Sequence, residues 1–301
     1  MLLKKTDIRF RIIDIIYIVM MVLPLAVGMV VNLLTKPVSD EITITGARIF
    51  FTIPMPLQDF PVTESQLNSA LVMITIFFFC LYLTHGIKER IELKRQHFAE
   101  LIVEKVDALV TDNMGEYFKG YSAFIIAILA LSAFSSLLSL LGLFPPTSDI
   151  NIVGGWAILV FILITYYKMK CGPLYYLKSF TEPVALLAPI NFLSEFATPI
   201  SMAFRHYGNV LSGTVISVLL GSALAGLSSM VLGALPGVLS EIPLFQIGIP
   251  AVLSIYFDVF SGCLQAFIFA MLTMMNISGA FPFEEYEKRK LKKKKIKSGG
   301  I

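Results

Sequence analysis

The 301-residue sequence has few of the polar side chains that a soluble protein needs. Charged residues make up 15% of it and hydrophobic residues 56%, with a mean hydropathy of +0.78. Typical globular chains are about 25% charged, and the smaller share found here cannot cover a water-facing surface. The same composition argues against disorder, because disordered segments are rich in charge and poor in hydrophobic residues. The sequence therefore indicates an integral membrane protein rather than a soluble enzyme.

Cysteine and histidine are also scarce, with three residues of each. Cys80, Cys171 and Cys263 stand in apolar stretches, too far apart for a metal site or a disulfide framework, and are read as small buried hydrophobic residues. No His, Cys and carboxylate cluster has metal-ligand spacing, and no GxxxxGK[ST] phosphate loop occurs. We expect no metal, no cofactor, no nucleic-acid partner and no ATP hydrolysis by this chain.

Long apolar runs predict about six membrane-spanning helices, because about 20 apolar residues cross a hydrocarbon core about 30 Å thick. The runs cover residues 12–34, 66–86, 121–144, 152–167, 189–226 and 243–278. The first run follows basic residues, as a signal peptide would. It is too long for one, however, and no small-residue cleavage site follows it. We therefore expect residues 12–34 to be retained as an additional first span.

The basic residues predict the orientation of these spans. Of the 24 Lys and Arg residues, 21 lie in segments 1–11, 86–119, 168–178 and 288–297, which are separated by even numbers of spans. The intervening connections hold only Lys36 and Arg48, and Arg205 lies inside a span. By the positive-inside rule both termini are cytoplasmic, in what we expect to be a bacterial-type cell membrane.

Two further segments are expected on the cytoplasmic side. Residues 87–118 carry apolar side chains at helical spacing among charges, which predicts an amphipathic helix lying on the membrane or against a partner. The basic tail, residues 284–301, is typical of a solvated segment that also binds anionic membrane lipid. No internal repeat is visible, so we treat residues 1–301 as a single membrane domain without the inverted repeats of many transporters.

The last two apolar runs are too long for perpendicular spans. They hold 38 and 36 residues, and 38 residues of continuous helix would be about 57 Å long. Unless Pro199 and the glycines break them, these helices must tilt steeply. We therefore predict an all-α fold in which residues 189–278 form a strongly tilted helical hairpin.

Arg205 is the most informative residue in this hairpin. An arginine at membrane depth costs at least ~3 kcal/mol and keeps its charge, so a functional reason for it is favoured over snorkelling to an interface. Asn209 and Ser212 follow at i+4 and i+7 and share its helical face. His206 points about 100° away from the arginine, and we read it as a hydrogen-bonded structural histidine rather than a proton relay.

Asp258 and Gln265 lie on the last span, two turns or about 10 Å apart on one face. An intramembrane carboxylate usually marks a proton or ion path. A simple ion pair between Asp258 and Arg205 is the alternative. Gln265 taken alone is more typical of an interhelical hydrogen bond, but one fixed cation, one titratable acid and two amides on overlong helices indicate an ion path.

Three segments carry a resemblance to a known family. PINFLSEFATPISMAFRHYGNVLSG (189–213) resembles the fifth-helix signature of subunit a of the F-type ATP synthase. LQAFIFAMLTMMNI (264–277) resembles that family's last-helix motif, and TSDIN (147–151) matches a turn between its third and fourth spans. The resemblance covers about residues 50–280, and its arginine motif is highly specific. It implies a non-catalytic stator subunit of a rotary motor.

In such a stator Arg205 would face the ring of c subunits, draw each ring carboxylate into its ionised form and separate two aqueous half-channels. Gln265 and Asn209 would sit beside it, and Glu195 would help line the cytoplasmic half-channel. The implied partners are the c-ring, the b subunits of the peripheral stalk and, indirectly, the soluble ATPase head. The coupling ion, H⁺ or Na⁺, is not specified.

The chain departs from the family pattern at three positions. Thr214 stands where many members carry Glu, and Asp258 where those members have His or Glu, so the external half-channel would depend on Asp258. His206 occupies a position that is usually Leu.

A secondary transporter in which Arg205 binds an anionic substrate is the competing hypothesis, and a purely structural membrane anchor is a third.

Overall fold

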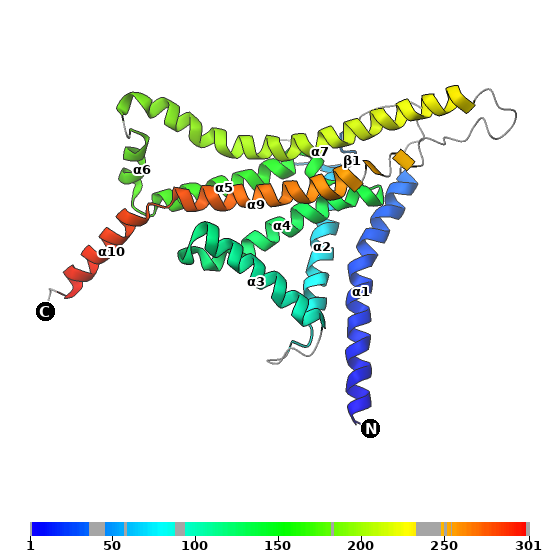
Figure 1. Cartoon of the computed structure of the whole chain (residues 1–301), viewed down its shortest axis with the longest axis horizontal. Coiled ribbons are helices and arrows are strands. Elements are labelled where there is room, and N and C mark those ends of the chain that lie inside the picture. The colour runs from blue at the N-terminus through cyan, green and yellow to red at the C-terminus, as the bar shows by residue number, and fades with distance from the viewer. Residues whose placement is uncertain are drawn as a thin grey trace.

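The computed structural model describes residues 2–35, 46–56, 59–87, 94–181, 184–232, 248–249, 252–253 and 255–298. Nearly all of the described structure is helical, and Figure 1 shows its arrangement. The helices are α1 (Leu2–Thr35), α2 (Glu64–Thr84), α3 (Lys94–Met114), α4 (Ser122–Leu137), α5 (Ile150–Met169), α6 (Pro173–Phe180), α7 (Ala188–Leu232), α9 (Gly262–Ala280) and α10 (Phe283–Ser298). Strands β1 (Ile49–Ile53) and β2 (Phe60–Thr63) form one antiparallel pair.

Six described helices are long and apolar enough to cross a membrane. They cover Arg11–Thr35, Glu64–Thr84, Glu116–Leu141, Ile150–Met169, Ala188–Val231 and Ile255–Ala280. The prediction of an all-α membrane protein with six spans is therefore confirmed. The third span begins earlier than predicted because a 3-10 turn, Glu116–Tyr121, continues directly into α4. Much of residues 243–254, the predicted start of the last span, lies outside the described residues.

Polar caps fix where two of the spans begin. The backbone N–H of Thr63 donates to the side chain of Gln66 at 3.3 Å, which closes a capping box at the start of α2. At the start of α5, the Asp149 carboxylate accepts from the backbone N–H of Asn151 at 2.9 Å. These contacts satisfy donors that a helix start otherwise leaves unpaired.

The main core lies where α3, α4, α5 and α9 meet. Its buried members are Val110, Met114, Phe118, Ile125, Ile128, Val160, Ile164, Tyr167, Met202, Phe269, Ala270, Met274, Ile277 and Phe281. Only Met202 in this set comes from α7. Helix α7 therefore lies on the outside of the packed unit, with one side against it.

Helix α7 is longer than predicted and passes through Pro199 without ending. Its 45 residues correspond to about 67 Å of helix, against a hydrocarbon core about 30 Å thick. Figure 1 shows α7 along the top of the molecule and α9 beneath it, with α1 below them at the right, running roughly perpendicular to both. The tilt of this pair relative to a membrane stays a prediction.

Helix α3 lies within the predicted amphipathic segment. Val106, Leu109, Val110 and Met114 pack against the main core of the same chain, whereas Phe98 and Leu101, nearer its start, are exposed. Part of its apolar face is therefore occupied within the chain.

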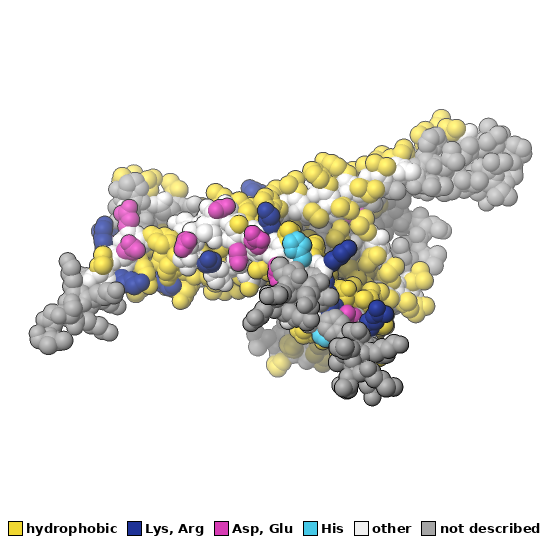
Figure 2. Space-filling model, turned by 60° about the horizontal axis from the view of Figure 1, so that its bottom comes forward, with side chains coloured by type: hydrophobic (Ala, Val, Ile, Leu, Met, Phe, Trp, Pro, Cys, Tyr) yellow, Lys and Arg dark blue, Asp and Glu magenta, His cyan; other side chains and the backbone are white. Residues whose placement is uncertain are grey.

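Figure 2 shows that charged side chains gather in a band across one face of the molecule, with hydrophobic side chains over much of the rest.

An ion pair at the β-hairpin ties β1 to the start of α2. Arg48 Nε lies 2.8 Å from Glu64 Oε2, and Arg48 Nη2 lies 3.1 Å from Glu64 Oε1. The hydrogen bonds that Arg48 donates to Glu64 raise the pKa of Arg48 further, so this guanidinium stays charged. Arg48 also donates to the backbone carbonyl of Thr35, at the end of α1.

Candidate functional site

Arg205 lies on the exposed side of α7. Met202, Ala203 and His206, within three residues of it in the sequence, are buried, whereas its neighbour Phe204 is exposed, so the opposite face of the helix points outward. Arg205, Asn209 and Ser212 are all exposed on that outward face, as their spacing predicts. Within the described part of the chain, no hydrogen bond or ion pair reaches the Arg205 guanidinium. A permanent charge is therefore presented on the exposed face of the helix, beside the polar side chains of Asn209 and Ser212.

His206 anchors the inner side of the same helical turn. It is fully buried, and its Nε2 lies 3.2 Å from Ser132 Oγ of α4. Its ring packs edge-on against Trp156 and Phe269, with centroid distances of 6.1 Å and 5.4 Å. Nδ1 is buried and has no hydrogen-bond partner among the described residues. The hydrogen bond and the ring contacts fix which face of α7 carries Arg205.

Asp258 lies in a π-helical turn, Ile255–Ser261, just before α9. Such turns occur frequently at functional sites. Asp258 lines a small cavity of about 10 Å³, enough for roughly one water, whose other polar lining residues are Ser136, Ser139, Asn209 and Ser261. No ion pair joins Asp258 to Arg205. The carboxylate thus lies beside a polar hollow that also contains the residue one turn beyond the arginine.

Two glycines bring the walls of this hollow together. A Cβ at Gly213 would lie 3.3 Å from Phe257 Cδ1, and a Cβ at Gly262 would lie 2.6 Å from Ser136 Cβ. The Asn209 amide donates to Ser261 Oγ at 3.0 Å, which bridges α7 and the π-helical turn. Only glycine allows the close approach of α9 to α4 at Gly262.

The predicted residues Gln265, Thr214 and Ser212 do not line the Asp258 cavity. Gln265 is buried within α9, with no hydrogen bond to Arg205. Thr214 is exposed and donates to the Val210 carbonyl at 3.1 Å, and the residue of α7 that lines the Asp258 cavity at this level is Gly213. Ser212 donates to the Asn209 carbonyl at 3.0 Å. Of the predicted set, Asp258 and Asn209 are the two residues that share a hollow.

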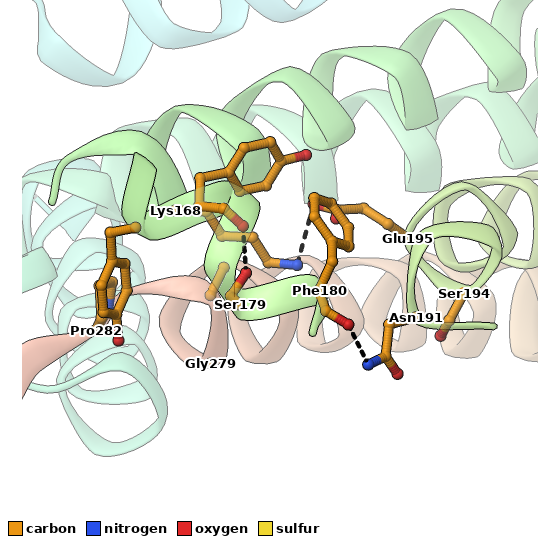
Figure 3. Close-up of a pocket in the computed structure, with 11 residues that line it drawn as sticks. Lys168, Ser179, Phe180, Asn191, Ser194, Glu195, Gly279 and Pro282 are labelled. Atoms are coloured by element: carbon orange, nitrogen blue, oxygen red, sulfur yellow. Dashed lines mark hydrogen bonds and ion pairs between the residues drawn. The ribbon is translucent and has the colours of Figure 1, made fainter. Parts of the chain in front are cut away.

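Glu195 lies on the other side of Arg205, ten residues earlier on α7 or about 15 Å along the helix. Its side chain is 3% exposed, and its Oε1 accepts from Lys168 Nζ of α5 at 3.0 Å. Its Oε2 is buried without a hydrogen-bond partner in the described structure. Figure 3 shows the pair between α5 and α7, with Gly279 of α9 and Ser179 of α6 nearby.

Two hollows meet at this ion pair. The outer one, of about 390 Å³, lies between α5, α6, α7 and the end of α9 and is lined by Tyr175, Tyr176, Ser179, Asn191 and Ser194, among others. The inner one, of about 210 Å³, is lined by Ile164, Thr198, Met275 and Asn276. Lys168, Glu195, Gly279 and Ala280 line both. The inner hollow extends toward Arg205, because Thr198, which lines it, lies two helical turns before Arg205 on α7.

The hydroxyl groups of the outer hollow are hydrogen-bond donors at neutral pH. Burial raises the pKa of Tyr176, and the nearby Glu195 adds to that rise. At the same end of the molecule, the Lys170 ammonium donates to the Tyr117 hydroxyl oxygen at 2.8 Å, and this hydrogen bond raises the pKa of Lys170. No group of three His, Cys, Asp or Glu side chains within the described ranges could hold a metal ion.

The sequence reasoning did not single out the partners of the predicted residues. Lys168 was counted only as a basic residue at the end of a span, and Ser132 and Asn276 lie within apolar runs. Their positions beside His206 and Glu195 depend on packing between distant segments, which no local pattern reports. The one available signal was that Lys168 directly follows an apolar run.

Together the fold and the site define a multi-pass membrane protein with polar groups along two packed helices, on both sides of an exposed arginine. The family model for the ATP synthase A chain matches residues 67–278. Subunit a of the sodium-ion-specific ATP synthase of Propionigenium modestum is 28% identical over 274 residues, covering 81% of this chain and 88% of that protein. ATP synthase subunit a of Desulforamulus reducens is 31% identical over 221 residues, covering 71% and 78%.

ATP synthase subunit a of Priestia megaterium is 30% identical over 197 residues, 61% of this chain and 77% of that protein. The match to the family model spans more than two thirds of the chain and includes both α7 and α9. The chain therefore belongs to the family of ATP synthase a subunits. It is a membrane component of a complex of several subunits that serves ATP synthesis and ion transport.

Proposed function

We propose that this chain is the non-catalytic, ion-translocating stator subunit of a rotary F-type ATP synthase. In this proposal Arg205 faces the c-ring and attracts each ring carboxylate in its ionised form. The observation that carries it is the exposed guanidinium, which has no partner within the described structure. A charge at membrane depth is costly without a partner, and a passing ring carboxylate would supply one.

The two groups of hollows support the assignment of two half-channels. Lys168, Glu195, Thr198 and Asn276 line the route that we assign to the cytoplasmic side, and Asp258 and Asn209 line the external one. The hollows lie on opposite sides of Arg205 along α7, so an ion entering one must pass the arginine to reach the other. A ring that carries the ion past Arg205 would couple ion flow to rotation, and a fixed positive charge there would block a direct leak.

The remaining assignments complete this role. The b subunits and, indirectly, the soluble ATPase head are the other proposed partners, and both termini lie in the cytoplasm of a bacterial-type cell. The coupling ion is a proton or a sodium ion; one of the relatives named above is sodium-specific. Gln265, Ser212 and Thr214 are proposed to tune the surroundings of the path, while His206 holds the orientation of α7.

The test is substitution of Arg205 in the assembled complex. Arg205→Ala should abolish ATP synthesis and ATP-driven ion uptake while complex yield stays near that of the unaltered protein. Arg205→Lys should also be severely impaired, because a compact ammonium differs from a planar, permanently charged guanidinium. Near-normal synthesis in either variant would show that the arginine is structural, and transport activity of this chain alone would favour a secondary transporter.

A further inference from the structure

The Lys168–Glu195 ion pair lies where the outer and inner hollows adjoin, a position that we call the neck. Both side chains line both hollows, together with Gly279 and Ala280 of α9. A Cβ at Gly279 would meet nothing within 4 Å, so the wall opposite the pair leaves open space. Figure 3 shows Lys168, Glu195 and Gly279 among the residues that line the outer hollow.

The Lys168 ammonium occupies only one oxygen of the Glu195 carboxylate, and the Tyr176 phenol lies close to the same carboxylate. Lys168 Nζ bonds one oxygen of Glu195 at 3.0 Å, and the other oxygen is buried without a hydrogen-bond partner in the described structure. The lysine side chain is 32% exposed against 3% for the glutamate. The ammonium can therefore withdraw into the outer hollow, whereas the carboxylate stays in the neck.

A buried carboxylate needs a compensating positive charge at all times. When the ammonium withdraws, another cation must take its place. The titratable groups around Glu195 are Lys168 of α5 and the phenols Tyr175 and Tyr176 of α6, while α9 contributes Asn276, Gly279 and Ala280. Lys168 is thus the one permanent cation that lines the neck within the described residues.

We propose that the Lys168–Glu195 pair is a gate between the two hollows. It is closed while the ammonium holds Glu195 and open while a monovalent cation, H⁺ or Na⁺, occupies the carboxylate instead. Charge balances in this exchange, since one cation leaves the carboxylate as another arrives and Lys168 keeps its proton. The inference rests on the proposed function, in which these hollows are the coupling ion's route to Arg205.

Lysine suits an exchangeable gate better than arginine does. An arginine fork would bond both carboxylate oxygens at once, including the oxygen that lysine leaves open. A structural ion pair predicts the reverse preference, because arginine would serve it as well as or better than lysine.

The first experiment measures ATP-driven ion uptake by the complete complex in inverted membrane vesicles, whose outer side is the cytoplasmic one. The variants are Lys168→Arg and Lys168→Met, and uptake is followed against pH at fixed sodium and against sodium at fixed pH. The profile that moves identifies the cation. Lys168→Arg should raise the cation concentration for half-maximal uptake about tenfold, the effect of one charged hydrogen bond. Lys168→Met should lower it, because no ammonium competes.

Two results would overturn the gate. One is an unchanged profile in Lys168→Arg, which folds with the pair intact. The other is equal profiles in all three proteins with loss confined to complex yield in Lys168→Met. Arg48→Met is the matched control: it breaks a similarly buried pair, with side chains 27% and 7% exposed, that lines none of these hollows. It should lower yield without moving either profile.

A second experiment separates failure of the gate from failure of the proposed route. Cysteine is placed at Gly279 after the native Cys80, Cys171 and Cys263 are changed to Ser, and a cationic methanethiosulfonate reagent is added. Modification at Gly279→Cys should block uptake, whereas Gly120→Cys, also in open space but off the hollows, should not. Uptake that survives modification at Gly279→Cys would remove these hollows from the ion route. Blocked uptake with unmoved Lys168 profiles would refute the gate alone.

Discussion

The close approach of α9 to α4 at Gly262 gives a prediction whose size follows from the coordinates. In Gly262→Ala the new Cβ would lie 2.6 Å from Ser136 Cβ and 3.1 Å from Ser136 Oγ. Carbon atoms attract best at about 3.5–4.0 Å, so the two helices must separate or Ser136 must move. Ser136 lines the Asp258 cavity, and the change therefore also perturbs the proposed external half-channel.

Two opposing terms set the magnitude of the effect. Overpacking of this kind costs about 1–3 kcal/mol, whereas Gly→Ala in a helix interior gains up to about 1 kcal/mol. Gly279→Ala on the same helix is the matched control, since its Cβ meets nothing within 4 Å. We therefore expect Gly262→Ala to be about 1–3 kcal/mol less stable than Gly279→Ala.

Thermal dissociation of the detergent-solubilised complex measures this difference, with complex yield as a second readout. Adding Ser136→Gly removes the opposing Cβ and should restore most of the stability lost in Gly262→Ala. Equal dissociation midpoints for Gly262→Ala and Gly279→Ala would refute the reasoning, because α9 would then have room at Gly262 that the structure does not show.

Three further predictions concern other parts of the chain. Asp258→Asn keeps size and hydrogen bonding but removes titration, so assembly should be preserved while proton-coupled turnover falls steeply. Lost assembly would favour an ion-pair role. His206→Leu breaks the hydrogen bond to Ser132 and should lower the stability of the complex, measured by thermal dissociation, by about 1 kcal/mol. Adding Ser132→Ala to this variant should lower the stability little further. If the effects of the two substitutions simply add, the two residues are not coupled. Single-cysteine labelling should find residue 40 outside and residue 293 inside, and an external amino terminus would contradict the six-span orientation.

The spans could be predicted because hydrophobic length is a local property of the sequence. Residues 12–34 and 152–167, for example, fall inside the helices Arg11–Thr35 and Ile150–Met169. Helix α7 extends six residues beyond the predicted end of its apolar run, to Leu232, and Pro199, which was named as a possible break, does not interrupt it. Proline is tolerated in a membrane helix when its surroundings satisfy the freed backbone carbonyl.

For the site, the sequence could predict only which residues share one face of a single helix. The spacing of Arg205, Asn209 and Ser212 places them together on any helix. The contact of Lys168 with Glu195 could not be foreseen, because it depends on how α5 and α7 pack. The resemblance pointed to Thr214 because many family members carry Glu there, but in this chain Gly213 lines the Asp258 cavity at that level.

Because α7 is supported along one side only, it has a stiff and a soft direction of bending. Movement toward its packed side presses Met202 and Ala203 into a dense core that resists compression. Movement the other way meets no part of this chain within the described structure, and Arg205 is on that side. A partner that slides past α7 therefore meets a compliant surface carrying a charge. Glu195 lies on the packed side of the same helix, where its ion pair with Lys168 ties α7 to α5.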